Sequence, residues 1–240
     1  MLPRTPSAVP ERVLQGSYVV TGGAQGLGAA VVDAIAQAGG EPTAFDIKPP
    51  AHAHSFAQVD VSDTGALTAA TDDVARRHRG LSGVVACAGI DACGPIDAVP
   101  FEAWERVIRV NLIAAAALVR AALPHFPHDG SGRIVTVAST LGLRALGDAS
   151  AYCASKFGVV GLTRALAAEL RGRVGVTCLI PGGMATGFFD GRPEQYRPPP
   201  DAQLNAPADV ANAAIFALAQ PRGCEVRELL ICPSLESSWP

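Results

Sequence analysis

Long runs of positive charge are missing from this 240-residue sequence, which holds 19 Lys and Arg residues against 22 Asp and Glu residues. The formal net charge is -3, and charged residues make up only 17% of the chain. Because nucleic acids and anionic membrane surfaces attract basic clusters, we expect neither of them as a partner. The expected partner is a small molecule.

The sequence also lacks the patterns of a metal site and of a membrane-targeting segment. Its six cysteines follow irregular spacings, with no C-x-x-C pair and no clustered histidines, so we expect reduced structural thiols and no bound metal. The N-terminal extension, residues 1–13, belongs to a stretch with three prolines and no continuous apolar core. We therefore expect neither a signal peptide nor a membrane span in this stretch. The expected location of the protein is the cytoplasm.

Hydrophobic residues are abundant, at 49% of the chain, and they recur in short β-branched runs that alternate with Ala- and Leu-rich helical stretches. This alternation predicts an α/β fold: a Rossmann-type, doubly wound, seven-stranded parallel sheet with helices on both faces. The length suits a single domain over residues 1–240. The predicted strands cover residues 17–21, 41–46, 55–60, 83–88, 133–139, 175–180 and 226–232.

A glycine-rich turn, TGGAQGLG, follows the first predicted strand directly and places Gly22, Gly26 and Gly28 at the start of a helix. Glycines let the backbone approach a pyrophosphate, whose charge then meets the free N–H groups and the dipole of the helix. Tight helix packing uses glycines in the same way, so the turn alone does not establish nucleotide binding.

Asp46 ends the second predicted strand, 18 residues after Gly28. An acidic side chain at about this separation accepts hydrogen bonds from the adenosine ribose and repels a 2'-phosphate. Lys48 is the only nearby cation that could weaken this preference. We therefore expect NAD rather than NADP, although a solvated aspartate is also common at the end of a strand.

The run YCASK places Tyr152 and Lys156 four residues apart on one face of a predicted helix. A tyrosine hydroxyl with its ordinary pKa of ~10 is a poor base, but a nearby ammonium and a cationic nicotinamide both favour the phenolate. Tyr152 would then act as the general acid/base. Ser139 closes the strand RIVTVAS, where its hydroxyl could hold the substrate oxygen. Taken alone, a Tyr–Lys pair at this spacing is usually incidental.

These motifs occur together with Asp60-Val61, VNL at 110–112 and PGGMAT at 181–186, in the order and at the intervals of the short-chain dehydrogenase/reductase family. The chain resembles this family over about residues 14–220. The resemblance implies an oxidoreductase with Asn111 as a fourth catalytic residue, which orders a water linking Lys156 to solvent from an interrupted helix. It also implies a homodimer or homotetramer that pairs through the helix after Tyr152.

The resemblance extends the expected cofactor site along the carboxyl edge of the sheet. Lys156 would bind the nicotinamide ribose, Thr186 the carboxamide, and Asp60 with Val61 would frame the adenine. The cofactor-binding residues we expect are Gly22, Gln25, Gly26, Leu27, Gly28, Asp46, Asp60, Val61, Ala88, Gly89, Tyr152, Lys156, Pro181, Gly182, Met184 and Thr186.

Two departures from the family pattern stand out. Cys87 takes the place of the usual asparagine before Ala88-Gly89, so the amide that braces the sheet next to the adenosine is missing and cofactor affinity is expected to be lower. The tail EVRELLICPSLESSWP lacks the usual Asp-Gly-Gly ending, which puts the usual tetramer contacts in doubt.

Residues 182–207, rich in Gly, Pro and aromatic residues, are too long for an ordinary connection and predict a substrate lid. Together with residues after Gly89 and residues 140–150, its aromatic side chains predict a mainly apolar pocket for a hydrophobic alcohol or ketone. An acid or phosphate could instead bind an arginine from the set Arg144, Arg192 and Arg197.

The leading hypothesis is therefore hydride transfer between NAD(H) and a secondary alcohol or ketone. Two alternatives stay open: an NADP-dependent carbonyl or 3-oxoacyl reductase, and a non-catalytic NAD-sensing protein, because fold alone does not establish function. The sequence does not select the substrate or the direction of the reaction.

Overall fold

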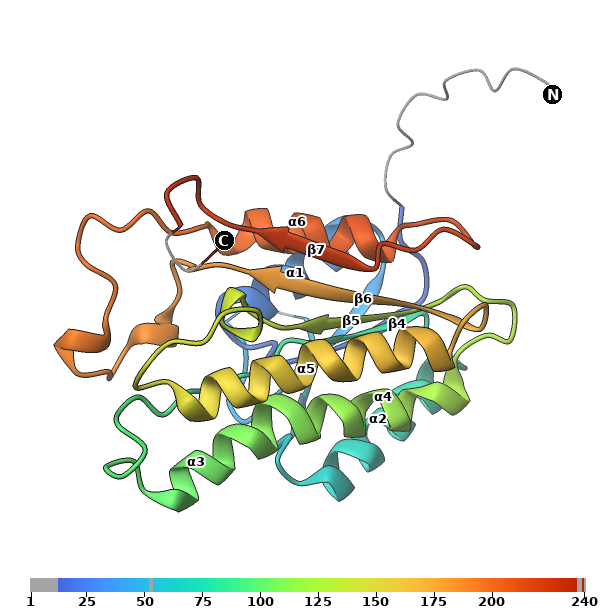
Figure 1. The fold of residues 1–240 in the computed structure, drawn as a ribbon. Coiled ribbons are helices and arrows are strands. Elements are labelled where there is room, and N and C mark those ends of the chain that lie inside the picture. The colour runs from blue at the N-terminus through green and yellow to red at the C-terminus, as the bar shows by residue number, and fades with distance from the viewer. Residues whose placement is uncertain (1–12, 52–53, 237–238, 240) are drawn as a thin grey trace.

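A seven-stranded parallel sheet forms the centre of the computed structural model, which describes residues 13–51, 54–236 and 239 (Figure 1). The strand order is β3-β2-β1-β4-β5-β6-β7, so the winding direction reverses between β1 and β4. The predicted doubly wound parallel sheet is confirmed. Residues 1–12 of the predicted N-terminal extension lie outside the described residues. The strands are β1 Ser17–Thr21, β2 Glu41–Asp46, β3 Ser55–Gln58, β4 Gly83–Ala86, β5 Gly132–Val137, β6 Val174–Pro181 and β7 Glu228–Ile231.

The strand ends differ from the prediction where the chain turns into loops at the carboxyl edge. β4 ends at Ala86, so Cys87 and Ala88 leave the ladder, and β3 ends at Gln58 instead of Asp60. At both of these ends the strand-like pattern of the sequence runs past the point where pairing with the neighbouring strand stops. At the opposite edge of the sheet, β7 starts at Glu228, two residues later than predicted.

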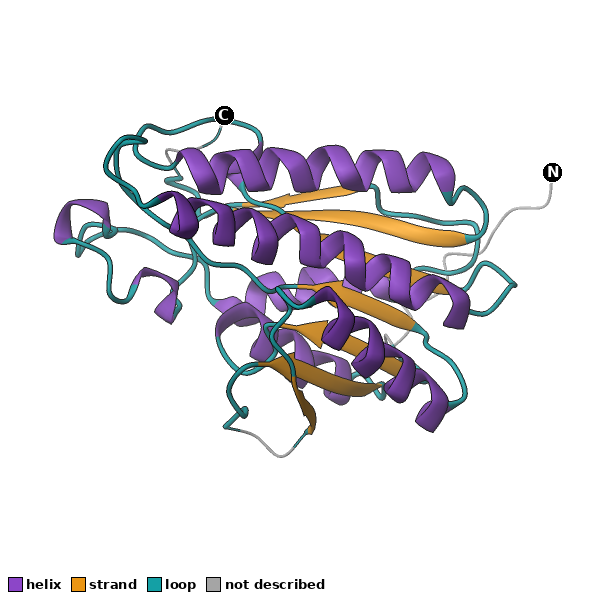
Figure 2. Ribbon diagram, turned by 90° about the horizontal axis from the view of Figure 1, so that it is seen from below, coloured by secondary structure: helices purple, strands orange, loops and turns teal. Residues whose placement is uncertain are grey.

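Helices cover both faces of the sheet (Figures 1 and 2). On one face lie α1 and α6, and on the other lie α2, α3, α4 and α5. A five-residue π-helical turn, Arg109–Ile113, joins α3 to α4 in one continuous helical run. The bounds are α1 Gly26–Gln37, α2 Thr64–His78, α3 Phe101–Ile108, α4 Ala114–Ala122, α5 Ser150–Glu169 and α6 Pro207–Leu218.

The central strands are apolar on both sides because each face of the sheet is covered by helices. Val19 of β1 packs into one core with Val84 of β4, whereas the next residue, Val20, packs into the opposite core with Val85. All four side chains are fully buried. The two-residue period of a strand therefore supplies both hydrophobic layers from one continuous apolar run.

The helical run Phe101–His125 is long and apolar enough, by length and composition, to cross a membrane, with a mean hydropathy of 1.6. Half of that stretch is buried inside the fold, where Leu118 and Ala122 belong to the core beneath α2. Core helices of globular proteins pass the same test, so this single helix is weak evidence for a membrane span.

The segment predicted as a lid, residues 182–207, extends from the carboxyl edge of the sheet and is closed at its base by main-chain pairing. Ala185 N donates to Asn205 O at 2.9 Å, and Asn205 N donates to Gly183 O at 2.9 Å. Two short 3₁₀ turns, Gly187–Phe189 and Glu194–Tyr196, lie between these two points. We call residues 182–207 the lid segment.

Candidate active site

A cavity of about 610 Å³ opens at the carboxyl edge of the sheet, over the point between β1 and β4 where the winding reverses. This is the place where doubly wound α/β folds bind their ligands. All sixteen residues predicted to bind the cofactor line it, as does Ser139. The predicted nucleotide end and the predicted chemical end thus belong to one continuous site.

The glycine turn has a shape that only glycine permits. Gly22 and Gly26 have φ values of +67° and +55°, and a Cβ on Gly22 would lie 2.8 Å from Ala88 Cα. A Cβ on Gly28 would collide with the carbonyl oxygen of Gly22. Gln25, the N-cap residue of α1, makes no capping bond with its side chain to the described residues. The turn therefore leaves the first N–H groups of the helix to a ligand.

Asp46 holds the glycine turn in place. Its carboxylate accepts hydrogen bonds from Ala24 N at 3.1 Å and from Lys48 N at 3.2 Å. The side chain of Lys48 is exposed. The sequence did not indicate this contact between Asp46 and the glycine turn. The contact places the Asp46 carboxylate beside the part of the cavity predicted to bind the adenosine.

Asp60 sits farther along the same end, where Ser62 donates to it from both its main-chain N at 2.9 Å and its hydroxyl at 2.7 Å. These two bonds hold the pKa of the Asp60 carboxyl below its usual range. The neighbouring Val61 is buried and belongs to the core. Asp60 is thus a fixed, ionised group at the rim of the cavity.

Tyr152 and Lys156 project from α5 into the cavity, with Lys156 Nζ 5.5 Å from the centroid of the Tyr152 ring. Burial lowers the pKa of Lys156 to about 8. Burial also raises the pKa of Tyr152 to about 12, and a hydrogen bond from Ser139 opposes this rise. In the free protein the neutral phenol is therefore favoured, because burying an anion is costly. The phenolate that the sequence predicts beside a cationic nicotinamide stays a prediction.

Ser139 follows β5 and caps the 3₁₀ turn Thr140–Gly142, where its hydroxyl oxygen accepts from Leu141 N at 3.2 Å. Its link to Tyr152 brings the hydroxyl and the phenol together, as the sequence predicted. Gly142 lets this turn lie against α5, because a Cβ there would be 2.7 Å from the carbonyl oxygen of Lys156.

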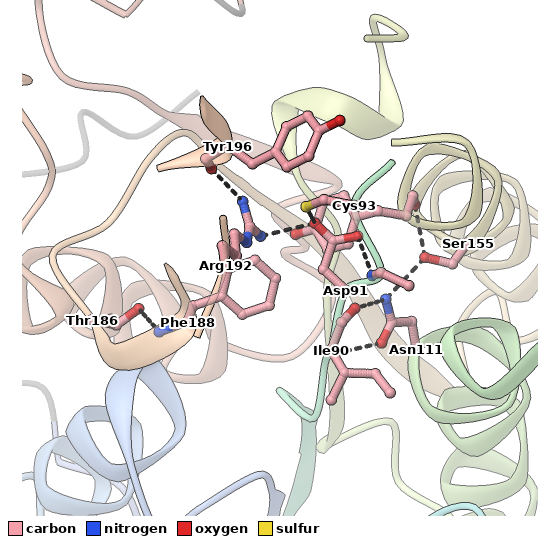
Figure 3. Close-up of polar contacts among 11 residues, drawn as sticks. Ile90, Asp91, Cys93, Asn111, Ser155, Thr186, Phe188, Arg192 and Tyr196 are labelled. Carbon is pink, nitrogen blue, oxygen red and sulfur yellow. Dashed lines mark hydrogen bonds and ion pairs between the residues drawn. The ribbon is translucent and has the colours of Figure 1, made fainter. Parts of the chain in front are cut away.

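Asn111 lies in the π-helical turn, so the helix bulges at this residue and does not stop. Its side-chain oxygen accepts from Ile90 N at 2.8 Å, and its amide nitrogen donates to Ile90 O at 2.9 Å and to Ser155 Oγ at 3.0 Å (Figure 3). The amide thus ties the loop after β4 to α5 and lies behind the cavity wall, buried at 2% exposure. Its predicted part in a water relay stays a prediction.

The brace that the family assigns to an asparagine at position 87 comes here from another strand. Thr21 Oγ1, at the end of β1, accepts from Ala88 N at 3.3 Å. Burial raises the pKa of the Cys87 thiol to about 12, so the residue that replaces the asparagine is a neutral thiol. No local motif marks Thr21 for this role in the sequence.

An ion pair between Asp91 and Arg192 crosses the cavity near the phenol, with 2.8 Å between Asp91 Oδ2 and Arg192 Nη2 (Figure 3). The guanidinium packs against the rings of Phe188 and Phe189, at 4.8 and 4.7 Å from their centroids. The ring centroid of Phe188 lies 5.6 Å from that of Tyr152. The cavity lining is mainly apolar, as predicted, and its aromatic wall also contains this largely buried charged pair.

The lid segment and the C-terminal tail complete the wall of the cavity. Tyr196 Oη donates to Asp148 Oδ2 at 3.0 Å, which joins the lid segment to the loop before α5. From the tail, Glu236 Oε2 accepts from Gly183 N at 2.8 Å, at the base of the lid segment. No motif in the sequence of the tail indicates this contact.

The family model described as short chain dehydrogenase matches residues 17–197. The chain is 36% identical over 186 residues to 2-dehydro-3-deoxy-L-rhamnonate dehydrogenase (NAD(+)) of Sphingomonas sp. (strain SKA58), covering 73% of this chain and 75% of that protein. It is 32% identical to cis-4-hydroxycyclohexanecarboxylate dehydrogenase of Sinomonas cyclohexanicum, covering 82% and 87% of the two chains.

Among solved structures, a short chain dehydrogenase from Burkholderia cenocepacia J2315 in complex with NADP superposes with a TM-score of 0.80 at 27% identity, covering 92% of this chain and 98% of that one. The match to the family model extends over most of the chain, and the named relatives are dehydrogenases. The chain therefore belongs to the short-chain dehydrogenase/reductase family and is an oxidoreductase that acts on CH–OH groups.

Proposed function

We propose that the protein transfers a hydride between NAD(H) and a secondary alcohol or ketone with Tyr152 as the general acid/base. The observation that carries this proposal is the convergence of a phenol, an ammonium and a hydroxyl in the cavity that also contains the glycine turn. A phenol, an ammonium and a hydroxyl without a nucleotide site would not support hydride transfer, and neither would a nucleotide site without these three groups. Here both line one wall.

The residues fit a dinucleotide along the length of the cavity. The glycine turn, from which a Cβ is excluded at Gly22 and Gly28, suits a pyrophosphate on the N-terminus of α1. Asp46 would accept from the adenosine ribose, and Lys156 would bind the nicotinamide ribose. Thr186 Oγ1 accepts from Phe188 N at 3.3 Å, which leaves its own hydroxyl proton to donate to a carboxamide.

NAD is the cofactor we propose on the ground of charge. Asp46 holds a carboxylate against the glycine turn, and a 2'-phosphate placed there would meet this negative charge. A reductase that uses NADP is the alternative, and Arg106, which lines the cavity near Asp60, is a cation that such an enzyme could use. Dissociation constants for NADH and NADPH separate the two.

The protein groups handle the proton and the substrate oxygen, while bound NAD⁺ supplies the hydride acceptor and a positive charge beside the phenol. Ser139 donates a hydrogen bond to the substrate oxygen and keeps it next to Tyr152 Oη. In oxidation Tyr152 would act as the phenolate, which the positive charges of the nicotinamide and Lys156 favour, and would take the hydroxyl proton. In reduction the neutral phenol, which burial favours in the free protein, gives its proton to the carbonyl oxygen.

The substrate we propose has an apolar body that packs on the aromatic side of the cavity. Phe188 and Phe189 stand edge to face at 5.7 Å between ring centroids, and Leu141 and Leu146 line the cavity as well. A steroid, an aromatic or cyclic alcohol and an oxoacyl group all have such a body.

The test is a Tyr152→Phe variant assayed for NAD⁺-dependent oxidation and NADH-dependent reduction over a panel of cyclic and aromatic alcohols and ketones. We expect turnover to fall by roughly 10²–10⁴-fold, the usual contribution of a general acid/base, with NADH binding retained. Retained turnover would remove Tyr152 from the mechanism. A protein that binds NADH but turns over nothing in the wild-type form would be an NAD sensor.

We also propose that the protein forms a homodimer or homotetramer. Phe157 of α5 is 44% exposed and Ile113 of the π-helical turn is 46% exposed, although α5 as a whole packs on the sheet. Apolar side chains on a helix that pairs with its symmetry mate become buried in the assembly. Light scattering coupled to size-exclusion chromatography measures the mass, and a monomer at all concentrations would contradict this proposal.

A further inference from the structure

Arg192 and Asp91 bring an unusual pair of charges into the aromatic part of the cavity (Figure 3). Arg192 comes from the lid segment, and Asp91 comes from the loop after β4. Both lie close enough to Tyr152 to act electrostatically on its phenol, in opposite directions. The pair therefore lies beside the position where the reacting carbon of a substrate would be.

The acceptor side of this pair is already engaged by three donors. Asp91 Oδ1 accepts from Ala92 N at 2.7 Å, and Oδ2 accepts from the Cys93 thiol at 3.1 Å and from Arg192 Nη2 at 2.8 Å. The side chain is only 8% exposed. Asp91 is thus held by its own loop, and its effect is to orient the guanidinium.

The donor side does have remaining capacity. A guanidinium carries five N–H donors. Arg192 uses Nη2 on Asp91 and Nη1, at a long 3.4 Å, on the carbonyl oxygen of Tyr196. Its Nε is buried and has no acceptor among residues 13–51, 54–236 and 239. A buried N–H without a partner is costly, so the site is arranged for an acceptor that the described protein groups do not supply.

We infer that Arg192 binds a carboxylate on the substrate, so that the substrate is a hydroxy acid or the corresponding oxo acid. This inference rests on the proposed function. A carboxylate matches the planar fork of a guanidinium with two parallel hydrogen bonds, and Phe188 and Phe189 flank the same guanidinium with apolar surface. The substrate then has an apolar body between its hydroxyl at Tyr152 and its carboxylate at Arg192.

Two other ligand classes fit less well. A neutral polyol would offer the guanidinium single hydroxyl oxygens and no charge-assisted pair of hydrogen bonds, and three donors already engage Asp91. A phosphate dianion would bring two negative charges toward Asp91 and toward Asp148, which also lines the cavity. A planar monoanion forms the paired hydrogen bonds and brings only one negative charge.

The experiment compares cyclohexanecarboxylate with cyclohexanecarboxamide, which has the same shape without the charge, by calorimetric titration into the protein saturated with NADH. Neither compound has a reacting hydroxyl, so binding is measured independently of turnover. The variants are Arg192→Met, Arg192→Lys and, as a matched loss of one positive charge on an exposed residue, Arg171→Met. Far-UV circular dichroism and NADH affinity check that each variant is folded.

We expect the wild-type protein and the Arg171→Met variant to bind the carboxylate at least about tenfold more tightly than the carboxamide, a difference of about 1.4 kcal/mol. Arg192→Met should abolish that preference, and Arg192→Lys should keep part of it because a point charge remains without the fork. Equal binding of the two compounds by the wild-type protein, preference for the carboxamide, or a preference that survives Arg192→Met would overturn the inference.

An activity arm keeps this result separate from the proposed function. Oxidation of 4-hydroxycyclohexanecarboxylate is compared with oxidation of its carboxamide. Higher kcat/KM for the acid, lost in Arg192→Met, supports the inference. If the carboxamide is oxidised as efficiently as the acid, the assignment to Arg192 is overturned and the role of Tyr152 is unaffected. If the carboxylate binds tightly but no substrate is turned over, only the proposed function is overturned.

Discussion

The ammonium nitrogen of Lys156 donates a 2.8 Å hydrogen bond to the main-chain carbonyl oxygen of Val137, the last residue of β5. Lys156 is 3% exposed, and burial lowers its pKa from the usual 10.5 to about 8. The charge that lies near the phenol is thus anchored to the sheet, and its presence depends on pH within a range that can be measured.

Stability should report this buried lysine directly. Below about pH 8 both the folded and the unfolded chain carry the proton, so the full cost of burying it applies. Between about 8 and 10.5 the unfolded chain binds a proton that the folded chain does not, so the Lys156 contribution to the free energy of unfolding rises with pH.

The measurement is urea denaturation of the wild type and of Lys156→Met between about pH 7 and pH 9.5, with the exposed Lys48→Met as control. The stability difference between wild type and Lys156→Met should move in favour of the wild type as pH rises, by no more than about 1.4 kcal/mol per pH unit. Parallel stability curves for these two proteins would contradict the assignment of the shift to Lys156.

Cofactor choice should depend on the charge of Asp46. Asp46→Asn removes that charge and retains one oxygen that can accept from Ala24 N or Lys48 N. We expect the ratio of the NADPH to the NADH dissociation constants to fall about tenfold, because the repulsion toward a 2'-phosphate is lost. Asp33→Asn, a change of equal charge on α1 where Asp33 pairs with His54, should leave the ratio as it is.

Two buried threonines on neighbouring strands offer a matched pair of substitutions. Thr21 Oγ1 accepts from Ala88 N, whereas the Thr43 hydroxyl is buried with no hydrogen-bond partner in the described part of the chain. Thr21→Val should cost about 1 kcal/mol of stability and weaken NADH binding, since it frees the loop beside the cofactor. Thr43→Val should be neutral or stabilising, and an equal cost at both sites in thermal melts would argue against the brace.

Two glycines in helices should respond in opposite ways to alanine. Gly28→Ala would force a Cβ into the carbonyl oxygen of Gly22 in the phosphate-binding turn, so we expect loss of NADH binding and a marked fall in Tm. Gly161 lies on α5, and apart from its chain neighbours and the backbone of its own helix, none of the described atoms lies within 4 Å of a Cβ added there. Gly161→Ala should raise stability by up to about 1 kcal/mol, the usual difference in helix propensity.

Local spacing was enough to find the parts of the site that each occupy one turn or one helix. Tyr152 and Lys156 are four residues apart on α5, and the glycine turn joins β1 to α1, so strand and helix periodicity place them without knowledge of the tertiary structure. The parallel sheet then brings their ends to one edge, which is why Ser139 could be placed beside them.

The contacts that sequence reasoning missed join residues far apart in the chain. Asp91 and Arg192 are 101 positions apart and carry no motif, so the sequence could assign both segments to one pocket but could not predict that these two side chains pair. The raised pKa of Tyr152 in the free protein could not be predicted from the sequence for a related reason. Its pKa is set by the depth of burial, which depends on how the lid segment and the loop before α5 close over it.

The main-chain pairing of Met184 with Asn205 means that the polypeptide leaves the sheet edge and returns to it through a single neck. Residues 187–204 form an excursion that starts and ends at this pairing, and no strand of the sheet lies within it. We call these residues the cassette. Evolution, or a protein engineer, could exchange this cassette for one of different length and composition without disturbing the strand order or the nucleotide-binding half. A large part of the aromatic cavity wall can then change through one short stretch of the gene.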